Sequence, residues 1–301
     1  MFNFLFSIRS SVPSLSVIIP TYKRTDILRE CLRHLDRQTV REDLEVIVVS
    51  DGHDEQTAAL RAEKRFRVPI TFLEVEKSHQ GVARNRGVAQ ATSSLCLFIG
   101  DDIFLREDAC EHHLIAHRRL LREEGIGTKS AIAVLGFTTW DPAIGVTPVM
   151  RWLETSGWQF GYPFLRSFSH TFVPRDRQHL FTYTSHISLP TSIARAHPFL
   201  KEVSLYGWED IEWGMRLRDA GVRLSYEPDA QALHHHHMTL EQSLTRMETL
   251  GASAVMMKRL VPRFDRLPQC WKKFTYIVGA LLPTMAGAHR RAFLRGMRRA
   301  G

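Results

Sequence analysis

Short β-branched runs alternate with helical patterns over the first third of the chain, and this alternation constrains the fold more than any other feature. Strands are predicted at 15–19, 44–49, 70–75 and 95–99. Apolar residues at helical spacing predict helices at 25–38 with Thr25 as the N-cap, from Glu55 onward, and at 82–91. Because such βαβ units build a sheet covered by helices, the sequence predicts an α/β fold whose ligands bind beyond the carboxyl ends of its strands.

The rest of the chain is less regular. An aromatic-rich stretch at 137–181 precedes short predicted strands and a helix that begins near Trp208. With 301 residues, 44% of them hydrophobic, the chain can build a substantial core. The four cysteines lie far apart without CxxC spacing, which supports neither a zinc knuckle nor a disulfide framework and favours a reducing, cytoplasmic compartment. Residues 1–11 lack a basic start and a long apolar run, so no export signal is predicted there.

The C-terminal region combines an apolar segment with many basic residues. Residues 274–288 are too few for a membrane span of about 20 residues, and Pro283 interrupts them. Two interpretations stay open: an interfacial segment at the inner face of a membrane with anionic lipid, or a helix docked on the domain. The net charge of +8 also suits nucleic acid or phosphorylated substrates, and charge alone does not choose among these partners.

Polar loops follow three of the predicted strands. The first strand is followed by PTYKR at 20–24 and the second by SDG at 50–52, so Thr21 and Asp51 lie where a ligand would meet them, although turn formation alone would also explain either loop. After the fourth strand come Asp101 and Asp102. Adjacent carboxylates repel each other, so a Mg²⁺ or Mn²⁺ ion that also binds a diphosphate would keep both ionised, whereas a solvated acidic turn is the alternative.

Two later segments carry charged residues at predicted helix starts. In GVARNRG at 81–87, Gly81 would admit a ligand and Arg84 or Arg86 would face a phosphate, unless the arginines are simply solvated. In the acidic segment that follows Trp208, a carboxylate packed among tryptophans would have a raised pKa that suits a general base. Capping of the helix by Glu209 or Asp210 is the simpler alternative.

Four histidines at 234–237 follow the last predicted strand. Imidazole nitrogens bind divalent transition metals, so one or more of them would complete a metal site with Asp102. A solvated polar strand end is the alternative for most of them.

Taken in order, these segments resemble the inverting glycosyltransferases of family 2, with matches spread from residue 15 to 251. The resemblance rests on SVIIPTY at 16–22, VVSDG at 48–52, GVARNRG at 81–87, GDD at 100–102, GWED at 207–210 and RLRDAG at 216–221, followed by the histidine strand. It implies a GT-A (Rossmann-like) fold with a mixed, mostly parallel sheet flanked by helices and a helical C-terminal extension. The implied domains are an N-terminal extension at 1–14, a catalytic domain at 15–240 with a nucleotide-binding half at 15–103 and an acceptor half at 104–240, and a basic helical extension at 241–301.

The same resemblance implies roles for individual residues. Asp51 would contact the base of the nucleotide, and Asp102 with His234 or His236 would bind Mn²⁺ or Mg²⁺. Asp210 would act as the general base, with Glu209 beside it, and Trp208 and His186 would contact substrate. The remaining nucleotide-binding residues would be Pro20, Thr21, Tyr22, Arg24, Gly81, Arg84 and Asp101.

Three positions depart from the family's usual pattern. Ser50 stands where many members have an aspartate, Gly100 where many have the first acid of a triple, and His186, in TSHIS at 184–188, where an asparagine is common. The Gln-x-x-Arg-Trp motif of the processive synthases is missing after the catalytic acid, so one sugar per encounter is expected.

The resemblance implies a metal-dependent transferase that moves one sugar from a nucleotide-diphosphate sugar, with UDP favoured, to an acceptor hydroxyl in polysaccharide, glycolipid or glycoprotein assembly. Three alternatives stay open. They are a catalytically inactive scaffold of the same fold, a nucleotide- or nucleic-acid-binding module, and a nucleotidyltransferase. The aspartates at the strand ends argue against a nucleic-acid groove there, and the loop at 20–24 lacks the glycines that a triphosphate-binding loop would need.

Overall fold

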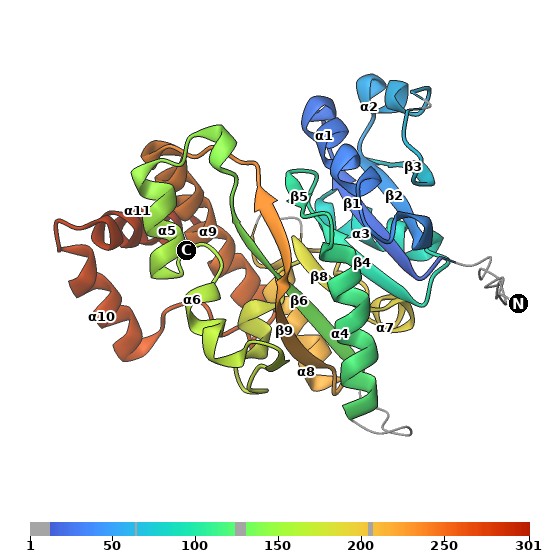
Figure 1. Ribbon diagram of the computed structural model, residues 1–301. Helices are drawn as coiled ribbons and strands as arrows, with labels where there is room; N and C mark the ends of the chain where they lie inside the picture. Colours follow the sequence, from blue (N-terminus) through green and yellow to red (C-terminus); the bar gives the residue numbers. More distant parts are fainter. Residues whose placement is uncertain (1–12, 64, 124–130, 204–206) are drawn as a thin grey trace, which may run out of the picture.

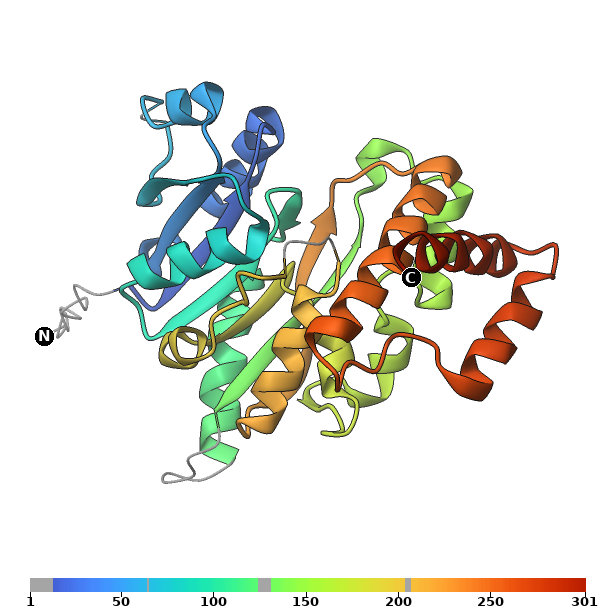
Figure 2. The same ribbon diagram turned by 180° about the vertical axis from the view of Figure 1, so that it is seen from behind.

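The computed structural model describes residues 13–63, 65–123, 131–203 and 207–301 (Figures 1 and 2). The segment at 1–11 for which no export signal is predicted lies outside these residues, and so does most of the predicted N-terminal extension. Within the described residues, none of the helices combines the length and the hydropathy that a membrane crossing requires.

The first part of the chain forms the predicted alternation of strands and helices. Its elements are β1 (Leu15–Thr21), α1 (Thr25–Asp36), the 3₁₀ turn Arg41–Asp43, β2 (Leu44–Asp51), α2 (Glu55–Leu60), β3 (Ile70–Val75), α3 (Gln80–Gln90) and β4 (Leu95–Ile99). The four strands are parallel in the order β3-β2-β1-β4. Alternate residues of β1 pack on opposite faces, with Val17 in the cluster that includes α1 and Ile18 in the cluster on the other side.

Several local predictions differ from the structure, among them the end of α1 at Asp36 and the bounds of α3 at Gln80–Gln90. Helix α1 begins at Thr25, but its N-cap is Arg24 and no side chain caps it, because the Thr25 hydroxyl faces that of Thr57 at 3.3 Å. Strands β1 and β2 each run two residues beyond their predicted ends, so that Thr21 and Asp51 are the last strand residues. Both side chains are therefore fixed by the sheet and not by a loop.

The second part of the chain extends the sheet with mixed pairing. Its elements are β5 (Ile103–Leu105), α4 (Ala109–Glu123), β6 (Ile132–Trp140), α5 (Pro148–Ser156), α6 (Tyr162–Leu165), β7 (Thr171–Phe172), β8 (His186–Pro190), α7 (Thr191–Ala196), α8 (Glu209–Asp219) and β9 (Arg223–His234), with 3₁₀ turns at Pro142–Ile144, Arg166–Phe168 and Gln178–Phe181. The order continues from β4 as β8-β6-β9-β5, with β7 on β9. Strand β8 is antiparallel to both of its neighbours, and β6 is parallel to β9.

Strand β9 is longer than the short strands predicted here. Its register with β6 shifts between Gly136 and Phe137, whose partners are Glu227 and Gln231. Residues 228–230 therefore have no partner on β6, and Pro228 is one of them. Because proline lacks a backbone N–H, it fits at a position where the sheet needs no hydrogen-bond donor. Beyond the bulge, β9 pairs with β5 so that His234 lies opposite Ile103. This register brings the histidine segment next to Asp102.

Three helices form the C-terminal extension: α9 (Leu240–Leu260), α10 (Cys270–Ala280) and α11 (Met285–Ala300). They lie on the far side of the molecule from β1, β2 and β3 (Figures 1 and 2). Helices α9 and α11 touch at two glycines, since a Cβ at Gly251 would overlap the carbonyl of Phe293 and a Cβ at Gly296 would overlap the carbonyl of Glu248. Only glycine therefore permits this backbone-to-backbone approach.

Candidate active site

A cleft of about 400 Å³ opens beyond the carboxyl ends of β1, β2 and β4. Most of the residues singled out in the sequence line it together: Pro20, Thr21, Tyr22, Arg24, Asp51, Arg84, Asp101, Asp102, Glu209, Asp210, His234 and His236. These residues come from both halves of the sheet and from α3 and α8. The fold thus gathers into one site side chains that lie more than two hundred positions apart in the sequence.

One end of the cleft is built around Asp51. Its carboxylate accepts hydrogen bonds from the Lys77 ammonium at 2.8 Å and from the Ser78 backbone N–H at 2.9 Å, and the side chain is almost fully buried. Lys77 also lies over the Tyr22 ring, 3.7 Å from its centroid, and Tyr22 packs against Gly52. The φ of +116° at Gly52 is one that residues with a side chain rarely adopt. An acid beside an aromatic face suits a heterocyclic base.

Ser50 has a different role from the aspartate that many family members carry at this position. Its hydroxyl donates to the Gly52 carbonyl at 2.7 Å and holds the turn that carries Asp51. The substitution therefore removes one carboxylate and leaves Asp51 as the acid of this loop.

At the centre of the cleft, Arg24 bridges the two adjacent aspartates. Its guanidinium donates to Asp101 at 2.8 Å and to Asp102 at 2.9 Å, and the Thr21 hydroxyl donates to Asp101 at 2.8 Å. Burial, and then the neighbouring Asp102 charge, raise the pKa of Asp101 to about 6. For Asp102 burial acts in the same direction, but hydrogen bonds from His234 and His236 outweigh it and hold the pKa well below its usual range.

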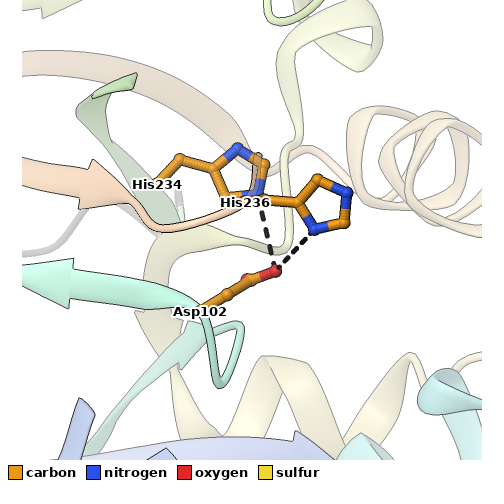
Figure 3. A group of neighbouring side chains, drawn as sticks. All are labelled: Asp102, His234 and His236. Carbon is orange, nitrogen blue, oxygen red and sulfur yellow. Dashed lines mark ion pairs between the residues drawn. The ribbon is translucent and has the colours of Figure 1, made fainter. Parts of the chain in front are cut away.

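Figure 3 shows the cluster that fits a metal ion. His234 Nε2 and His236 Nδ1 each lie 3.5 Å from the same oxygen of Asp102, and all three ligand atoms lie within 4.8 Å of one another. Two ligand atoms bound to one ion at about 2.1 Å lie roughly 3–4 Å apart. The donor set of two imidazoles and one carboxylate therefore fits a divalent transition metal such as Mn²⁺.

The histidine segment divides its side chains between two sides. Because an extended chain alternates, His235 points away from Asp102 and binds Asp141 through its Nδ1 at 2.6 Å. Its ring stacks on Phe104, whereas the His234 ring stacks on Trp140. His234 and His236 therefore face the Asp102 carboxylate, and His235 does not.

The position of the Asp102 side chain explains why residue 100 is a glycine. A Cβ there would lie 2.7 Å from an oxygen of Asp102 and 3.3 Å from Ile103. A side chain at this position would displace the carboxylate that faces the two histidines.

Between the aspartate pair and α8 lies a buried arginine. The Arg84 guanidinium is 4.0 Å from Glu209, and its Nη2 donates to Gln80 at 3.4 Å. Glu209 in turn accepts hydrogen bonds from the Gln80 amide and from the Gly207 backbone N–H. Two nitrogens of Arg84 are buried without hydrogen-bond partners. This site can therefore accept a further oxygen ligand such as a phosphate.

Asp210 has the chemistry expected of a base. Burial first, and then the adjacent Glu209 charge, raise the pKa of Asp210 to about 7. One of its oxygens accepts the Ile211 N–H at 2.8 Å, and the Thr182 hydroxyl binds its backbone carbonyl at 2.8 Å. A carboxyl group that titrates near neutral pH can take up a proton from a hydroxyl and release it again.

Three residues expected at the site do not line the cleft. The Trp208 indole donates to the Leu250 carbonyl and packs in the cluster beneath α9. His186 is fully buried in β8, where its ring fills the space that a side chain at Gly136 would need. The N–H of Gly81 is capped by His79, and its missing side chain leaves room for Phe199.

The cleft also contains residues that the sequence did not assign to it. They are Gln80, Thr184, Ser185, Gln159, Phe160, Met238 and Arg246, with Gly100 and Gly207. Gln80 directly precedes the GVARNRG motif, and Ser185 directly precedes His186. Their position next to predicted site residues is the one feature of the sequence that could have indicated them. Arg246 lies on α9 in the C-terminal extension and donates to Gln159. Nothing in the sequence around Arg246 indicates that the extension reaches the cleft.

Of the aromatic stretch, Phe160 is the member at the cleft. Trp152 and Trp158 pack on His289, and Tyr162 is buried in the core. Phe160 adopts a φ of 54°, a left-handed conformation that is uncommon for a bulky residue, and its ring lies 5.7 Å from that of His234. Such strain is typical of positions that serve a site.

Comparisons with known proteins agree with this geometry. Residues 16–120 match the sequence model of glycosyl transferase family 2. Validoxylamine A glucosyltransferase of Streptomyces hygroscopicus subsp. jinggangensis is 29% identical over 248 residues, which cover 76% of this chain and 57% of that protein. The chain thus spans about half the length of the curated relatives that it matches.

Two solved structures share the fold. Mannosyltransferase PcManGT from Pyrobaculum calidifontis, in complex with GDP-Man and Mn²⁺, has a TM-score of 0.58 and 19% identity, with coverage of 97% of this chain and 77% of that one. S. aureus TarS has a TM-score of 0.57 and 18% identity, with coverage of 90% and 44%. The mixed sheet with its flanking helices is that of GT-A glycosyltransferases. The likeness shows the GT-A fold, and the ordered motifs and the match over residues 16–120 support a glycosyltransferase of family 2.

Proposed function

We propose that the protein is a metal-dependent, inverting glycosyltransferase that moves one sugar from a nucleotide-diphosphate sugar, with UDP as the favoured nucleotide, to an acceptor hydroxyl. The observation that carries the proposal is the cleft itself, where Asp51, the cation-binding cluster and Asp210 lie in one continuous space. Its order matches the parts of a nucleotide sugar, from base through diphosphate to the reacting sugar.

The nucleotide would bind along the strand ends. Asp51 would accept a hydrogen bond from the base while the Tyr22 face packs against it, and Arg84 would contact a phosphate through its unpartnered nitrogens. We assign this half of the domain, residues 15–103, to the donor and residues 104–240 to the acceptor. Arg246 on α9 would add the C-terminal extension to the acceptor side.

The divalent cation would be held by Asp102, His234 and His236, where the 3.5 Å separations fit a shared ion. When bound, such a cation neutralises charge that develops on the leaving diphosphate. Arg24 binds the same Asp102 oxygen and would turn towards the phosphates as the cation takes its place.

Asp210 would remove the proton from the acceptor hydroxyl as that oxygen attacks the anomeric carbon. The bond from carbon to the diphosphate oxygen breaks on the opposite face of the sugar, so the anomeric configuration inverts. Glu209 would keep the Asp210 pKa raised, and its contact with Arg84 would fix the start of α8.

The acceptor would be a carbohydrate, a lipid-linked sugar or another hydroxyl compound of polysaccharide, glycolipid or glycoprotein assembly. Phe160 would form an apolar platform for its ring, since sugars present apolar faces to aromatic side chains. We place the enzyme in the cytoplasm, with peripheral contact at the inner face of a membrane through its basic C-terminus.

A thermal-shift panel with UDP, TDP, GDP and ADP, each with Mn²⁺ and with EDTA, tests donor and cation together. A ligand that binds only the folded state raises the melting temperature, so the cognate nucleoside diphosphate should do so only when the metal is present. Asp51→Asn should abolish the preference among bases, whereas Glu55→Gln on the exposed start of α2 serves as the control. If none of the diphosphates shifts the melt with Mn²⁺ present, the transferase proposal is wrong. The anomeric configuration of the product, measured by NMR, tests inversion.

A further inference from the structure

Helix α10 exposes an apolar face that no other element of the described structure covers. Of the exposed large hydrophobic side chains in the described residues, half lie between positions 271 and 282. They are Trp271, Phe274, Ile277, Val278, Leu281 and Leu282. Trp271, Phe274 and Leu281 are 69%, 68% and 78% exposed, values at which a large apolar side chain gains little from the fold. A patch this concentrated marks an interaction surface.

The exposed apolar side chains lie on one side of the helix. Positions 271, 274, 278 and 281 recur at intervals of three and four, which places them along a single stripe. The opposite side faces α11, where Tyr276 contacts the Phe293 ring and Ala280 is buried. Figures 1 and 2 show α10 at the margin of the molecule, between the segment that follows α9 and the turn into α11. The stripe therefore points outward.

Positive charge is concentrated around this stripe. Residues 258–301 contain eleven lysines and arginines and a single aspartate, a net charge of +10, whereas the whole chain has +8. The remainder of the chain, at −2, is thus slightly acidic, and the basic balance of the protein belongs to this extension. Lys272 and Lys273 lie next to Trp271 on the exposed surface of α10.

We propose that α10 is a membrane-docking helix, which inserts its apolar stripe into the interface of a bilayer rich in anionic lipid while its lysines bind the headgroups. The proposal rests on the peripheral membrane contact proposed above and assigns it to a named surface. An amphipathic segment with aromatic residues on one face and cations beside them has the chemistry that such interfaces recognise. The adjacent basic residues add long-range attraction to the same surface.

A second copy of the chain is a poorer occupant of this face. Pairing two stripes would bring the Lys272 and Lys273 ammonium groups of both copies together without an intervening acid on α10. Like charges in a desolvated contact oppose association, whereas phosphate headgroups complement them.

Sedimentation with sucrose-loaded vesicles tests the proposal. The full chain should sediment with vesicles that contain phosphatidylglycerol and remain in solution with phosphatidylcholine alone. Lys272→Glu with Lys273→Glu should weaken binding by at least about 30-fold, since each basic residue near an anionic surface contributes about 1 kcal/mol. Phe274→Ser with Leu281→Ser should weaken it at least about tenfold, because less apolar surface enters the interface.

Matched controls lie on α4, whose exposed surface also carries large apolar and basic side chains. Ile115→Ser with Leu121→Ser and Arg118→Glu with Arg122→Glu should leave vesicle binding unchanged. Equal binding to both vesicle types, no binding, or binding that the α10 variants do not reduce would overturn the proposal. A dimer in sedimentation velocity that Phe274→Ser dissociates, without vesicle binding, would overturn it in favour of a second copy. The Mn²⁺-dependent diphosphate shift of the same variants should stay as in the wild type, which separates this proposal from sugar transfer.

Discussion

Replacement of Asp210 by asparagine is expected to abolish transfer and at the same time to stabilise the fold. The asparagine Oδ1 can still accept the Ile211 N–H, and the Thr182 hydroxyl binds a backbone carbonyl that the substitution leaves in place. The change therefore removes a charge and a proton acceptor while the start of α8 keeps its hydrogen bonds. Loss of a general base costs about 10²–10⁴ in rate.

The gain in stability follows from the raised pKa of Asp210. Burial and the Glu209 charge raise it from its ordinary value of 3.8 to about 7, so the folded state binds this proton more tightly than the unfolded state. The stabilisation that this proton gives is complete below the unfolded pKa and is lost as the pH rises through the folded pKa. At about 1.36 kcal/mol per pKa unit, the cost above pH 7 is at most about 4 kcal/mol, which asparagine avoids. Each kcal/mol of added unfolding free energy raises the melting temperature of a chain of this size by about 2 °C, so the Asp210→Asn variant should melt several degrees above the wild type.

The assay compares melting temperatures from pH 4 to pH 8. The Asp210→Asn variant should melt several degrees above the wild type at pH 8, and the difference should shrink towards pH 4. In the wild type, kcat should fall about tenfold per pH unit below pH 7, because the base becomes protonated. Asp26→Asn removes one almost fully exposed carboxylate with its surface ion pair to Arg29, and it serves as the control for loss of a charge that is not buried. A lower melting temperature for Asp210→Asn at pH 8 would refute the burial argument, and unchanged transfer would remove Asp210 from the mechanism.

Three further predictions concern other parts of the molecule. His236→Ala should weaken Mn²⁺ binding by at least about tenfold in isothermal titration calorimetry, whereas His235→Ala should not, and equal effects would contradict the assigned ligands. Gly214→Ala should lower the free energy of unfolding by about 1–3 kcal/mol in urea, because its Cβ would overlap Thr182; an unchanged midpoint would show that Thr182 moves aside. Phe160→Leu should raise the acceptor KM about three- to tenfold and leave the donor Kd unchanged, and a change in donor Kd alone would place Phe160 elsewhere.

The strands of the first half were predictable because their apolar runs are short, continuous and separated by regular helices. The predicted ends of β1 and β2 fall two residues before the observed ends, Thr21 and Asp51, since polar residues at a strand end resemble the start of a loop. Strand β9 was not delimited, because Pro228 interrupts its pattern and the bulge that admits a proline depends on the pairing with β6.

The site was predictable where chemistry is local and not where it depends on packing. Asp101 and Asp102 are adjacent in the sequence, and so are the four histidines at 234–237, so both groups could be recognised without knowledge of the fold. Which of the histidines face Asp102 depends on the register of the strand, and the pairing of β9 with β5 sets that register. The sequence predicts His186 at the substrate, whereas its ring fills the space that the missing side chain of Gly136 leaves. The sequence does not indicate that these two residues lie against each other.

The close contact of α9 with α11 gives the last helix an influence on the cleft that it does not touch. Gly251 lies little more than one turn after Arg246, and Gly296 fixes the same pair of helices from the other side. A side chain larger than glycine at position 296 would push α9 sideways and carry the Arg246 guanidinium with it. The shape of the cleft would then respond to a substitution at Gly296, five residues before the last residue, without any change at a residue that lines the cleft.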